Sequence, residues 1–226
     1  MPRTVAIIQA RMGSRRLPGK VLMDLAGKPL LRHVIDRTRQ AAMPDEVVVA
    51  TCLGDGSEAI VERCRRWGVA CYSDRHGWDV LRRFLGAAEA YDAEWIVRVC
   101  ADNPLLVPEW IDALVEAALA DRFDYTAYEL SPGVPAITRP TGYFAEVTTR
   151  EALERAERMM APNDPRREHV TACLYAEAWR FRCRWLPVPE AYRLDPPPSA
   201  SIDTAEDFRR VERMVEESKD EAIAAN

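Results

Sequence analysis

The sequence predicts an α/β domain built on a doubly wound, mostly parallel sheet, with an antiparallel segment inserted after the first half. Short apolar runs rich in β-branched residues alternate with amphipathic segments as far as residue 123. The first of these runs leads directly into a loop rich in glycine and cationic side chains. The alternation stops at residue 124. A chain of 226 residues can bury its core as one domain, so we expect a single domain.

In the first half, each apolar run is read as a buried strand and each amphipathic run as a covering helix. Pro29 suits the start of a helix, Ser57 suits an N-cap, and Gly68 suits a helix end. The expected strands lie at 5–10, 46–52, 69–73 and 95–101. The expected helices lie at 29–42, 57–67, 79–91 and 108–120.

The second half is less regular. A loop with three prolines and a glycine is expected at 131–141, and a second loop at 161–167. The prolines of 195–198 are expected to interrupt regular secondary structure. The expected strands lie at 124–130, 143–148 (antiparallel) and 180–188, and the expected helices at 149–160, 168–177 and 205–219.

The loop after the first strand is the main functional signal. It contains two glycines, and no acidic residue occurs between Thr4 and Met23. Such a loop at the carboxyl end of a first strand is where an α/β sheet binds phosphates. Five residues separate Gly13 from Gly19 and Val21 follows the lysine, so this is neither a Walker A loop nor a G-x-G-x-x-G turn. Its cations are Arg11, Arg15, Arg16 and Lys20.

One aspartate is a candidate metal ligand by its position. Asp102 follows the fourth strand, where a side chain projects into the same crevice as the first loop. Asp203 precedes the last helix. Carboxylates and phosphate oxygens together suit Mg²⁺. Two structural alternatives stay open: Asp102 could cap the turn before Pro104, and Asp203 or Thr204 could cap the last helix.

Composition limits the classes of binding partner and the cellular compartment that we expect. The net charge of −5 argues against a general nucleic-acid binder, and no apolar run approaches the length of a membrane span. The six cysteines form no C-x-x-C pair, and the three histidines lack metal-ligand spacing to them. Free thiols are typical of a reducing cytosol, and no signal peptide is seen, so a cytoplasmic location is expected.

Six motifs spread over the chain resemble one known family. They are A-R-M-G-S-R-R-L-P-G-K at 10–20, L-A-G-K-P-L-L-R-H-V-I at 25–35, C-A-D-N-P-L at 100–105, E-V-T-T-R-E-A-L-E-R-A at 146–156, R-E-H-V-T at 167–171 and S-I-D-T-A-E-D-F at 201–208. They are similar to the cytidylyltransferases that activate acidic sugars such as 3-deoxy-manno-octulosonate and sialic acid. The spore-coat polysaccharide biosynthesis branch is the nearest.

The resemblance implies a Rossmann-like nucleotide-diphospho-sugar transferase fold and a homodimer. It implies transfer of CMP from CTP to a small acidic sugar, with Mg²⁺ and release of pyrophosphate, in surface polysaccharide biosynthesis. It divides the domain into a mononucleotide-binding half at 1–123, an acceptor and dimerisation segment at 124–190, and a return at 191–226. The run at 73–79 departs from the branch's pattern near the base. A nucleotide other than CTP therefore stays possible. Two further alternatives are a sugar phosphate acceptor and a non-catalytic nucleotide-binding assembly protein.

Residue roles follow from the same resemblance. The expected catalytic residues are Arg11, Arg16 and Lys20, and the expected metal ligands are Asp102 and Asp203. The expected acceptor-binding residues are Arg139, Tyr143, Glu146 and His169, of which the histidine could equally be structural or lie at an interface. The expected nucleotide-binding residues are Gln9, Ala10, Arg11, Met12, Gly13, Ser14, Arg16, Gly19, Lys20 and Asp79.

Overall fold

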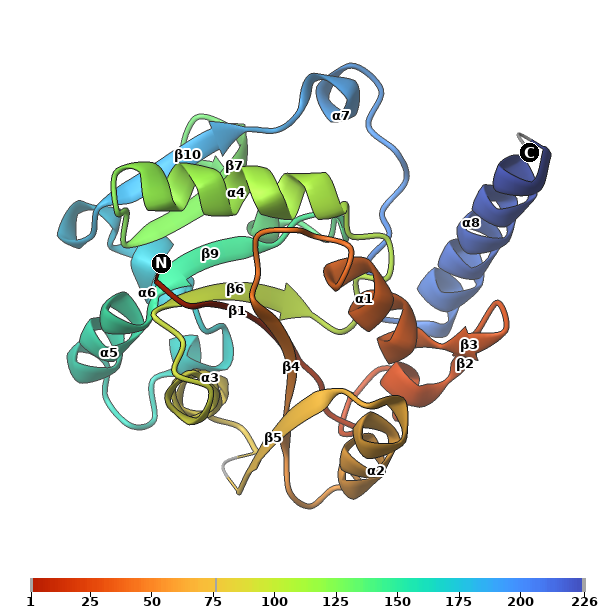
Figure 1. The fold of residues 1–226 in the computed structure, drawn as a ribbon, viewed down its shortest axis with the longest axis horizontal. Coiled ribbons are helices and arrows are strands. Elements are labelled where there is room, and N and C mark those ends of the chain that lie inside the picture. Colours follow the sequence, from red (N-terminus) through yellow and green to blue (C-terminus); the bar gives the residue numbers. More distant parts are fainter. Residues whose placement is uncertain (1, 76, 225–226) are drawn as a thin grey trace.

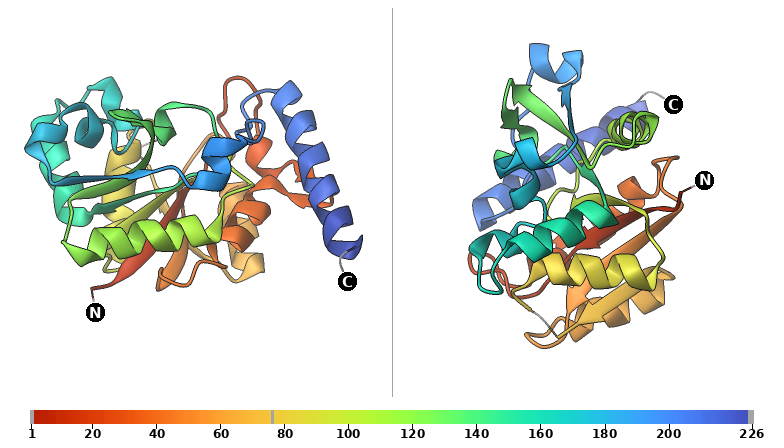
Figure 2. Two further views of the ribbon diagram at one scale, coloured as in Figure 1. Left: turned by 90° about the horizontal axis from the view of Figure 1, so that it is seen from above. Right: turned by 90° about the vertical axis from the view of Figure 1, so that its left-hand side faces the viewer.

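The fold is a sheet covered by helices on both faces, seen in a computed structural model that describes residues 2–75 and 77–224, with side chains to 218 (Figures 1 and 2). The main sheet has the strand order β10-β7-β9-β6-β1-β4-β5, with β8 paired to β7. Its strands are β1 (Thr4–Gln9), β4 (Glu46–Cys52), β5 (Ala70–Asp74), β6 (Trp95–Cys100), β7 (Tyr125–Ser131), β8 (Val134–Pro135), β9 (Glu146–Thr149) and β10 (Cys183–Pro187). A separate hairpin joins β2 (Asp24–Leu25) to β3 (Lys28–Pro29).

Strand direction matches the predicted mixture. Strand β1 pairs in parallel with β4 and β6, β4 pairs in parallel with β5, and β7 pairs in parallel with β10. Strand β9 runs against both of its neighbours, β6 and β7. The mostly parallel α/β class with an antiparallel segment is therefore confirmed.

The helices are α1 (Leu30–Thr38), α2 (Glu58–Trp67), α3 (Val80–Ala90), α4 (Pro108–Ala120), α5 (Arg150–Met159), α6 (Ala172–Ala176), α7 (Glu190–Leu194) and α8 (Ala205–Ala224). Short 3₁₀ turns lie at η1 (Lys20–Leu22), η2 (Ala136–Thr138), η3 (Pro165–Glu168) and η4 (Ala178–Arg180). In the part of the chain that the structure describes, no helix combines the length and the apolar character needed to cross a bilayer.

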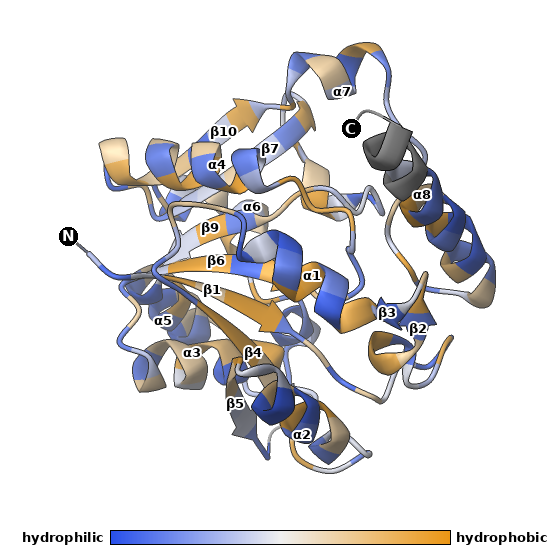
Figure 3. Cartoon of the chain, turned by 45° about the vertical axis from the view of Figure 1, so that its right-hand side comes forward, coloured by the Kyte–Doolittle hydropathy of each residue, from blue (hydrophilic) through white to orange (hydrophobic). Residues whose placement is uncertain are grey.

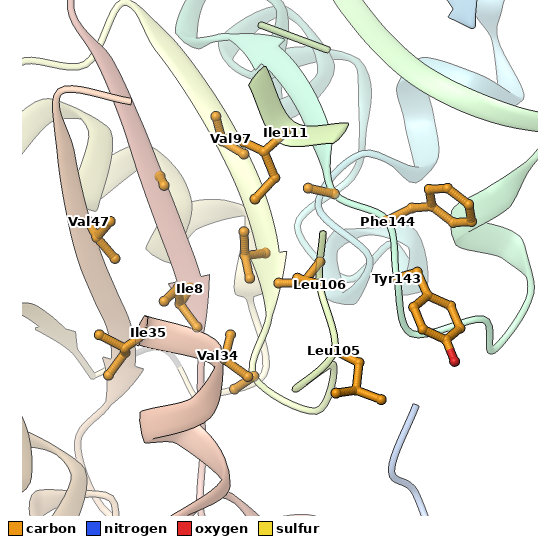
Figure 4. Packing of buried hydrophobic residues seen from close by; sticks show 14 of the residues in the cluster. Ile8, Val34, Ile35, Val47, Val97, Leu105, Leu106, Ile111, Tyr143 and Phe144 are labelled. Carbon is orange, nitrogen blue, oxygen red and sulfur yellow. The ribbon is translucent and has the colours of Figure 1, made fainter. Parts of the chain in front are cut away.

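Two apolar cores lie on opposite faces of the sheet, because successive strand residues point to opposite sides. Ala6 and Ile8 of β1 join α1, α2, α4 and α8 in one core, whereas Val5 and Ile7 join α3, α5 and α6 in the other. Figure 4 shows Ile8 packed with Val34 and its neighbours, and Figure 3 shows the hydrophobic central strands. Burial on both faces explains why these strands read as continuous apolar runs.

Several local expectations differ from the structure. The predicted helix at 168–177 is instead η3 followed by α6, because the backbone leaves helical geometry at His169, with φ −110° and ψ 62°. Helix α1 ends at Thr38 rather than near residue 42. Hairpin β2–β3 and helix α7 were not expected, and the loop at 131–141 contains β8 and η2.

Candidate active site

A pocket of about 750 Å³ opens at the carboxyl ends of β1 and β6. The first loop, the start of α3, the segment 137–144, the turn after η3 and the segment before α8 form its walls. Parallel strands end at the same edge of the sheet, so these distant segments converge there. Ten predicted site residues line the pocket: Gln9, Ala10, Arg11, Ser14, Arg16, Lys20, Asp102, Arg139, His169 and Asp203.

Lys20 lies at the centre of the charged cluster. Gly19 adopts a φ of +72°, which turns the chain into η1, and the lysine side chain is then largely buried, with the residue only 8% exposed. The lysine Nζ donates to Asp102 Oδ2 at 2.9 Å and to Asp203 Oδ1 at 3.3 Å, and also to the carbonyl of Ile202. A single ammonium thus lies between the two predicted metal ligands.

The two aspartates are also joined through the backbone. The N–H of Ile202 donates to the carbonyl of Asp102 at 3.0 Å, and Arg16 binds Asp203 Oδ1 at 2.8 Å. Two carboxylates that already share a cation are a donor set that suits a hard divalent ion, which uses one or two carboxylates together with phosphate oxygens and water.

The glycine-rich loop is shaped by contacts beneath it. The N–H of Met12 donates to Ser57 Oγ at 3.1 Å, and a Cβ on Gly13 would lie 2.5 Å from Asp55 Oδ2. A side chain at position 13 would therefore displace the carboxylate of Asp55. Ser57 does not cap α2 through its side chain, because its hydroxyl serves the loop instead. Met12, Gly13 and Gly19 lie outside the pocket lining and set the path of the loop.

Asp79 lies away from the pocket lining. Its carboxylate caps α3 by accepting from Arg82 N–H at 3.0 Å, and it binds Arg167 at 2.7 Å. Both members of this ion pair are nearly buried, and Arg167 also reaches Glu157 at 3.0 Å. The pair ties η3 to the start of α3, and both segments contribute pocket residues.

Tyr143 and Glu146 also lie outside the lining. The Tyr143 hydroxyl donates to the carbonyl of Pro198 at 2.6 Å, and this bond joins the pocket wall to the segment that leads to Asp203. Glu146 is fully buried and accepts hydrogen bonds from Arg98 and from the Tyr125 hydroxyl. Burial raises the pKa of Tyr125 well above its usual value, and the adjacent Glu146 carboxylate adds to this effect.

Sequence reasoning missed two buried arginines in the lining, Arg83 of α3 and Arg98 of β6. Burial lowers the pKa of Arg83, whose Nη2 donates to the carbonyl of Gly77 at 2.8 Å. A charged residue within the apolar run of β6 was the available signal for Arg98. With Arg11, Arg15, Arg16, Lys20 and Arg139, these two give the lining seven basic residues against the acidic Asp102, Glu168 and Asp203.

A doubly wound sheet with a cationic, carboxylate-bearing pocket at the ends of β1 and β6 is typical of enzymes that bind and act on phosphorylated ligands. The sequence matches the family described as cytidylyltransferase over residues 5–222. The chain belongs to the cytidylyltransferase family and is a nucleotidyltransferase.

Among the relatives is the spore coat polysaccharide biosynthesis protein SpsF of Bacillus subtilis, 32% identical over 216 residues, covering 94% of this chain and 86% of SpsF. The 3-deoxy-manno-octulosonate cytidylyltransferase of Geobacter metallireducens is 39% identical over 123 residues, covering 53% of this chain and 46% of that protein.

Solved structures share the fold. A cytidylyltransferase from Leptospira borgpetersenii serovar Hardjo-bovis has a TM-score of 0.80 at 26% identity, covering 94% of this chain and 86% of that one. A CMP:2-keto-3-deoxy-manno-octonic acid synthetase complexed with CTP has a TM-score of 0.71 at 17% identity, covering 96% and 99%.

Proposed function

We propose that this protein transfers the CMP unit of CTP to a hydroxyl group of a small acidic sugar and releases pyrophosphate. The observation that carries the proposal is the Lys20 ammonium shared between Asp102 and Asp203 on the wall of a cationic pocket. The SpsF relative and the family membership support the cytidylyl group and a role in surface polysaccharide biosynthesis.

In this reaction the acceptor oxygen bonds to the α-phosphorus of CTP, and the bond from that phosphorus to the bridging oxygen breaks. The acceptor hydroxyl loses its proton to solvent water, and the bond electrons of the broken P–O bond leave with pyrophosphate. Arg11, Arg16 and Lys20 bind the triphosphate and stabilise the charge that develops on the leaving group. Backbone N–H groups near Ser14 add further donors.

Asp102 and Asp203 would hold Mg²⁺, whose chemistry when bound is to neutralise phosphate charge. His169 and Arg139 line the pocket and contribute to the acceptor side. The protein acts in the cytoplasm as a homodimer, and the mononucleotide half at 1–123 supplies the nucleotide site.

The test is pyrophosphate release from CTP and Mg²⁺ with 3-deoxy-manno-octulosonate, N-acetylneuraminate and neutral sugars, and with GTP, UTP and ATP in place of CTP. Release with CTP and an acidic sugar is expected. Asp102→Asn should abolish it, whereas Asp121→Asn on the exposed end of α4 should not. Release only with another nucleotide or a sugar phosphate would overturn the base or acceptor assignment. CTP binding without release from any acceptor would point to a non-catalytic protein.

A further inference from the structure

Arg98 is a buried cation at the inner part of the pocket. It lies four residues before Asp102 on the same chain, and only 6% of its surface is exposed. Side chains two apart in a strand share a face about 7 Å apart, so Arg98 lies deeper along β6 than Cys100, which also lines the pocket. Ile96, on that same face, packs in the core beside α3 and α6. Arg98 therefore lies below the Lys20–Asp102 cluster, towards α3 and α6.

Its guanidinium is held from one side by a buried carboxylate. Glu146 stands directly opposite Arg98 in the antiparallel register of β6 and β9, and its Oε2 accepts from Arg98 Nη1. The other oxygen, Oε1, accepts from the Tyr125 hydroxyl and from Thr171 Oγ1 at 2.8 Å. Both carboxylate oxygens are engaged, so residues of three other segments of the chain set the direction of the guanidinium.

The remaining donors of Arg98 are poorly used. A guanidinium carries five N–H donors. Nη2 reaches Gln9 Oε1 at only 3.5 Å, the outer limit of a hydrogen bond, and Nε has no hydrogen-bond partner among the described residues. Buried donors without partners are rare in folded proteins, so this guanidinium has unused hydrogen-bonding capacity.

The surrounding lining can accommodate a polar ligand. His169 and Tyr175 reach the pocket from the turn after η3 and from α6, and Val80 adds an apolar contact from α3. The triphosphate is assigned to the cations of the first loop, beyond the strand ends. With the triphosphate at that loop, as the proposed function has it, Arg98 is left for an anionic group of the acceptor.

We infer that Arg98 binds the acidic group of the acceptor and so selects acidic over neutral acceptors, an inference that rests on the proposed function. A carboxylate matches the planar fork of a guanidinium and can accept two parallel N–H bonds. Glu146 is then the residue that holds Arg98 in position and does not itself contact the acceptor.

The experiment compares each sugar acid with its own methyl ester, which differ in the charged group alone. The probes are 3-deoxy-manno-octulosonate and N-acetylneuraminate, with CTP and Mg²⁺. Arg98→Gln leaves Glu146 buried without its cation and is liable to misfold, so the main variant is Arg98→Gln with Glu146→Gln, whose two amides can bond to each other. Arg122→Gln, an exposed arginine paired with Glu94, is the matched control.

The wild type and Arg122→Gln should favour the acid over the ester in kcat/KM. In the double variant this preference should fall about 10- to 100-fold, the size of one charge-assisted bidentate contact, through a higher KM for the acid. The KM for CTP should stay unchanged, which a purely structural role would not guarantee.

Three results would overturn the inference while leaving the proposed function intact. They are an unchanged acid-to-ester preference in a folded double variant, a raised KM for CTP in place of the acid, and a wild type that treats acid and ester alike. Pyrophosphate release only with neutral or phosphorylated acceptors would overturn the inference and correct the acceptor class. The absence of pyrophosphate release from the wild type with every acceptor would refute both.

Discussion

Replacing Lys20 with methionine tests the charged cluster most directly. Methionine keeps an unbranched side chain of similar length but removes the ammonium. Lys20→Met deletes two ion pairs and a bond to the carbonyl of Ile202. It removes the cation that Asp102 and Asp203 share and leaves Arg16 as the remaining partner of Asp203.

The size of the effect can be worked from these contacts. A hydrogen bond to a charged group contributes about 1.5–3 kcal/mol. The side chains of Asp102 and Asp203 are 28% and 34% exposed, so water recovers part of the loss, and we expect a net destabilisation of about 2–3 kcal/mol. For a chain of this size each kcal/mol lowers Tm by about 2–4 °C, which gives a fall of about 4–12 °C.

Turnover with CTP should fall as well. Loss of one charge-assisted contact to the triphosphate corresponds to about a 10- to 150-fold lower kcat/KM for CTP. Thermal unfolding with and without Mg²⁺, together with pyrophosphate release, measures both effects. Because a divalent ion can replace the missing positive charge, Mg²⁺ should raise the Tm of Lys20→Met more than that of the wild type.

The control is Lys28→Met, which removes a half-exposed lysine paired with Asp36 at 2.7 Å. A pair at the surface contributes about 1 kcal/mol or less, so its Tm should stay within a few degrees of the wild type. A Lys20→Met protein as stable and as active as Lys28→Met would refute the reasoning. Equal Mg²⁺ effects on Lys20→Met and the wild type would argue against metal binding by these two carboxylates.

Three further predictions concern groups around the pocket. A Cβ on Gly142 would lie 2.3 Å from the carbonyl carbon of Ala200, so Gly142→Ala should displace the segment before α8 and lower turnover about tenfold or more, and unchanged kinetics would contradict this. Asp79→Ala leaves the buried Arg167 without this carboxylate partner and removes the N-cap of α3. The free energy of unfolding in urea should therefore fall by about 3–5 kcal/mol, while the CTP affinity measured by calorimetry stays near the wild-type value. Burial opposes ionisation of Asp207, but hydrogen bonds at the start of α8 outweigh it and lower its pKa to about 2. Its contribution of about 1–2 kcal/mol is therefore complete above about pH 4 and lost as the pH falls towards 2, and Asp207→Asn should flatten that part of the unfolding profile.

The parallel half of the fold could be predicted because its signal is local. Strands such as Glu46–Cys52 are buried on both faces and are therefore visible in the sequence as continuous apolar runs. The position of β9 could not be predicted in this way. It is only four residues long and lies between β6 and β7, and that choice of neighbours depends on pairings between residues 19 to 54 positions apart in the sequence.

The same difference between local signals and long-range contacts applies to the residues of the candidate site. The cations of the first loop could be assigned because they lie within one short motif, and the structure brings Lys20 to both predicted aspartates. Asp79 could not be assigned, because its partner Arg167 is 88 residues away and a capping aspartate looks the same in sequence as a ligand. Arg98 was overlooked for a related reason: its role depends on Glu146, 48 residues further on.

The carboxylates of the pocket pair with its cations when no ligand is bound. Arg11 binds Glu168 at 2.9 Å and Arg16 binds Asp203 at 2.8 Å, while Lys20 binds Asp102. These pairings offset the mutual repulsion of a concentrated group of cations before any phosphate is present. Phosphate oxygens that take over Arg16 and Lys20 would leave both aspartates free to bind a divalent ion. A triphosphate that binds Arg16 and Lys20 frees the two carboxylates for the metal, and a metal that binds the carboxylates frees the two cations for the triphosphate. Binding of either ligand would therefore strengthen binding of the other.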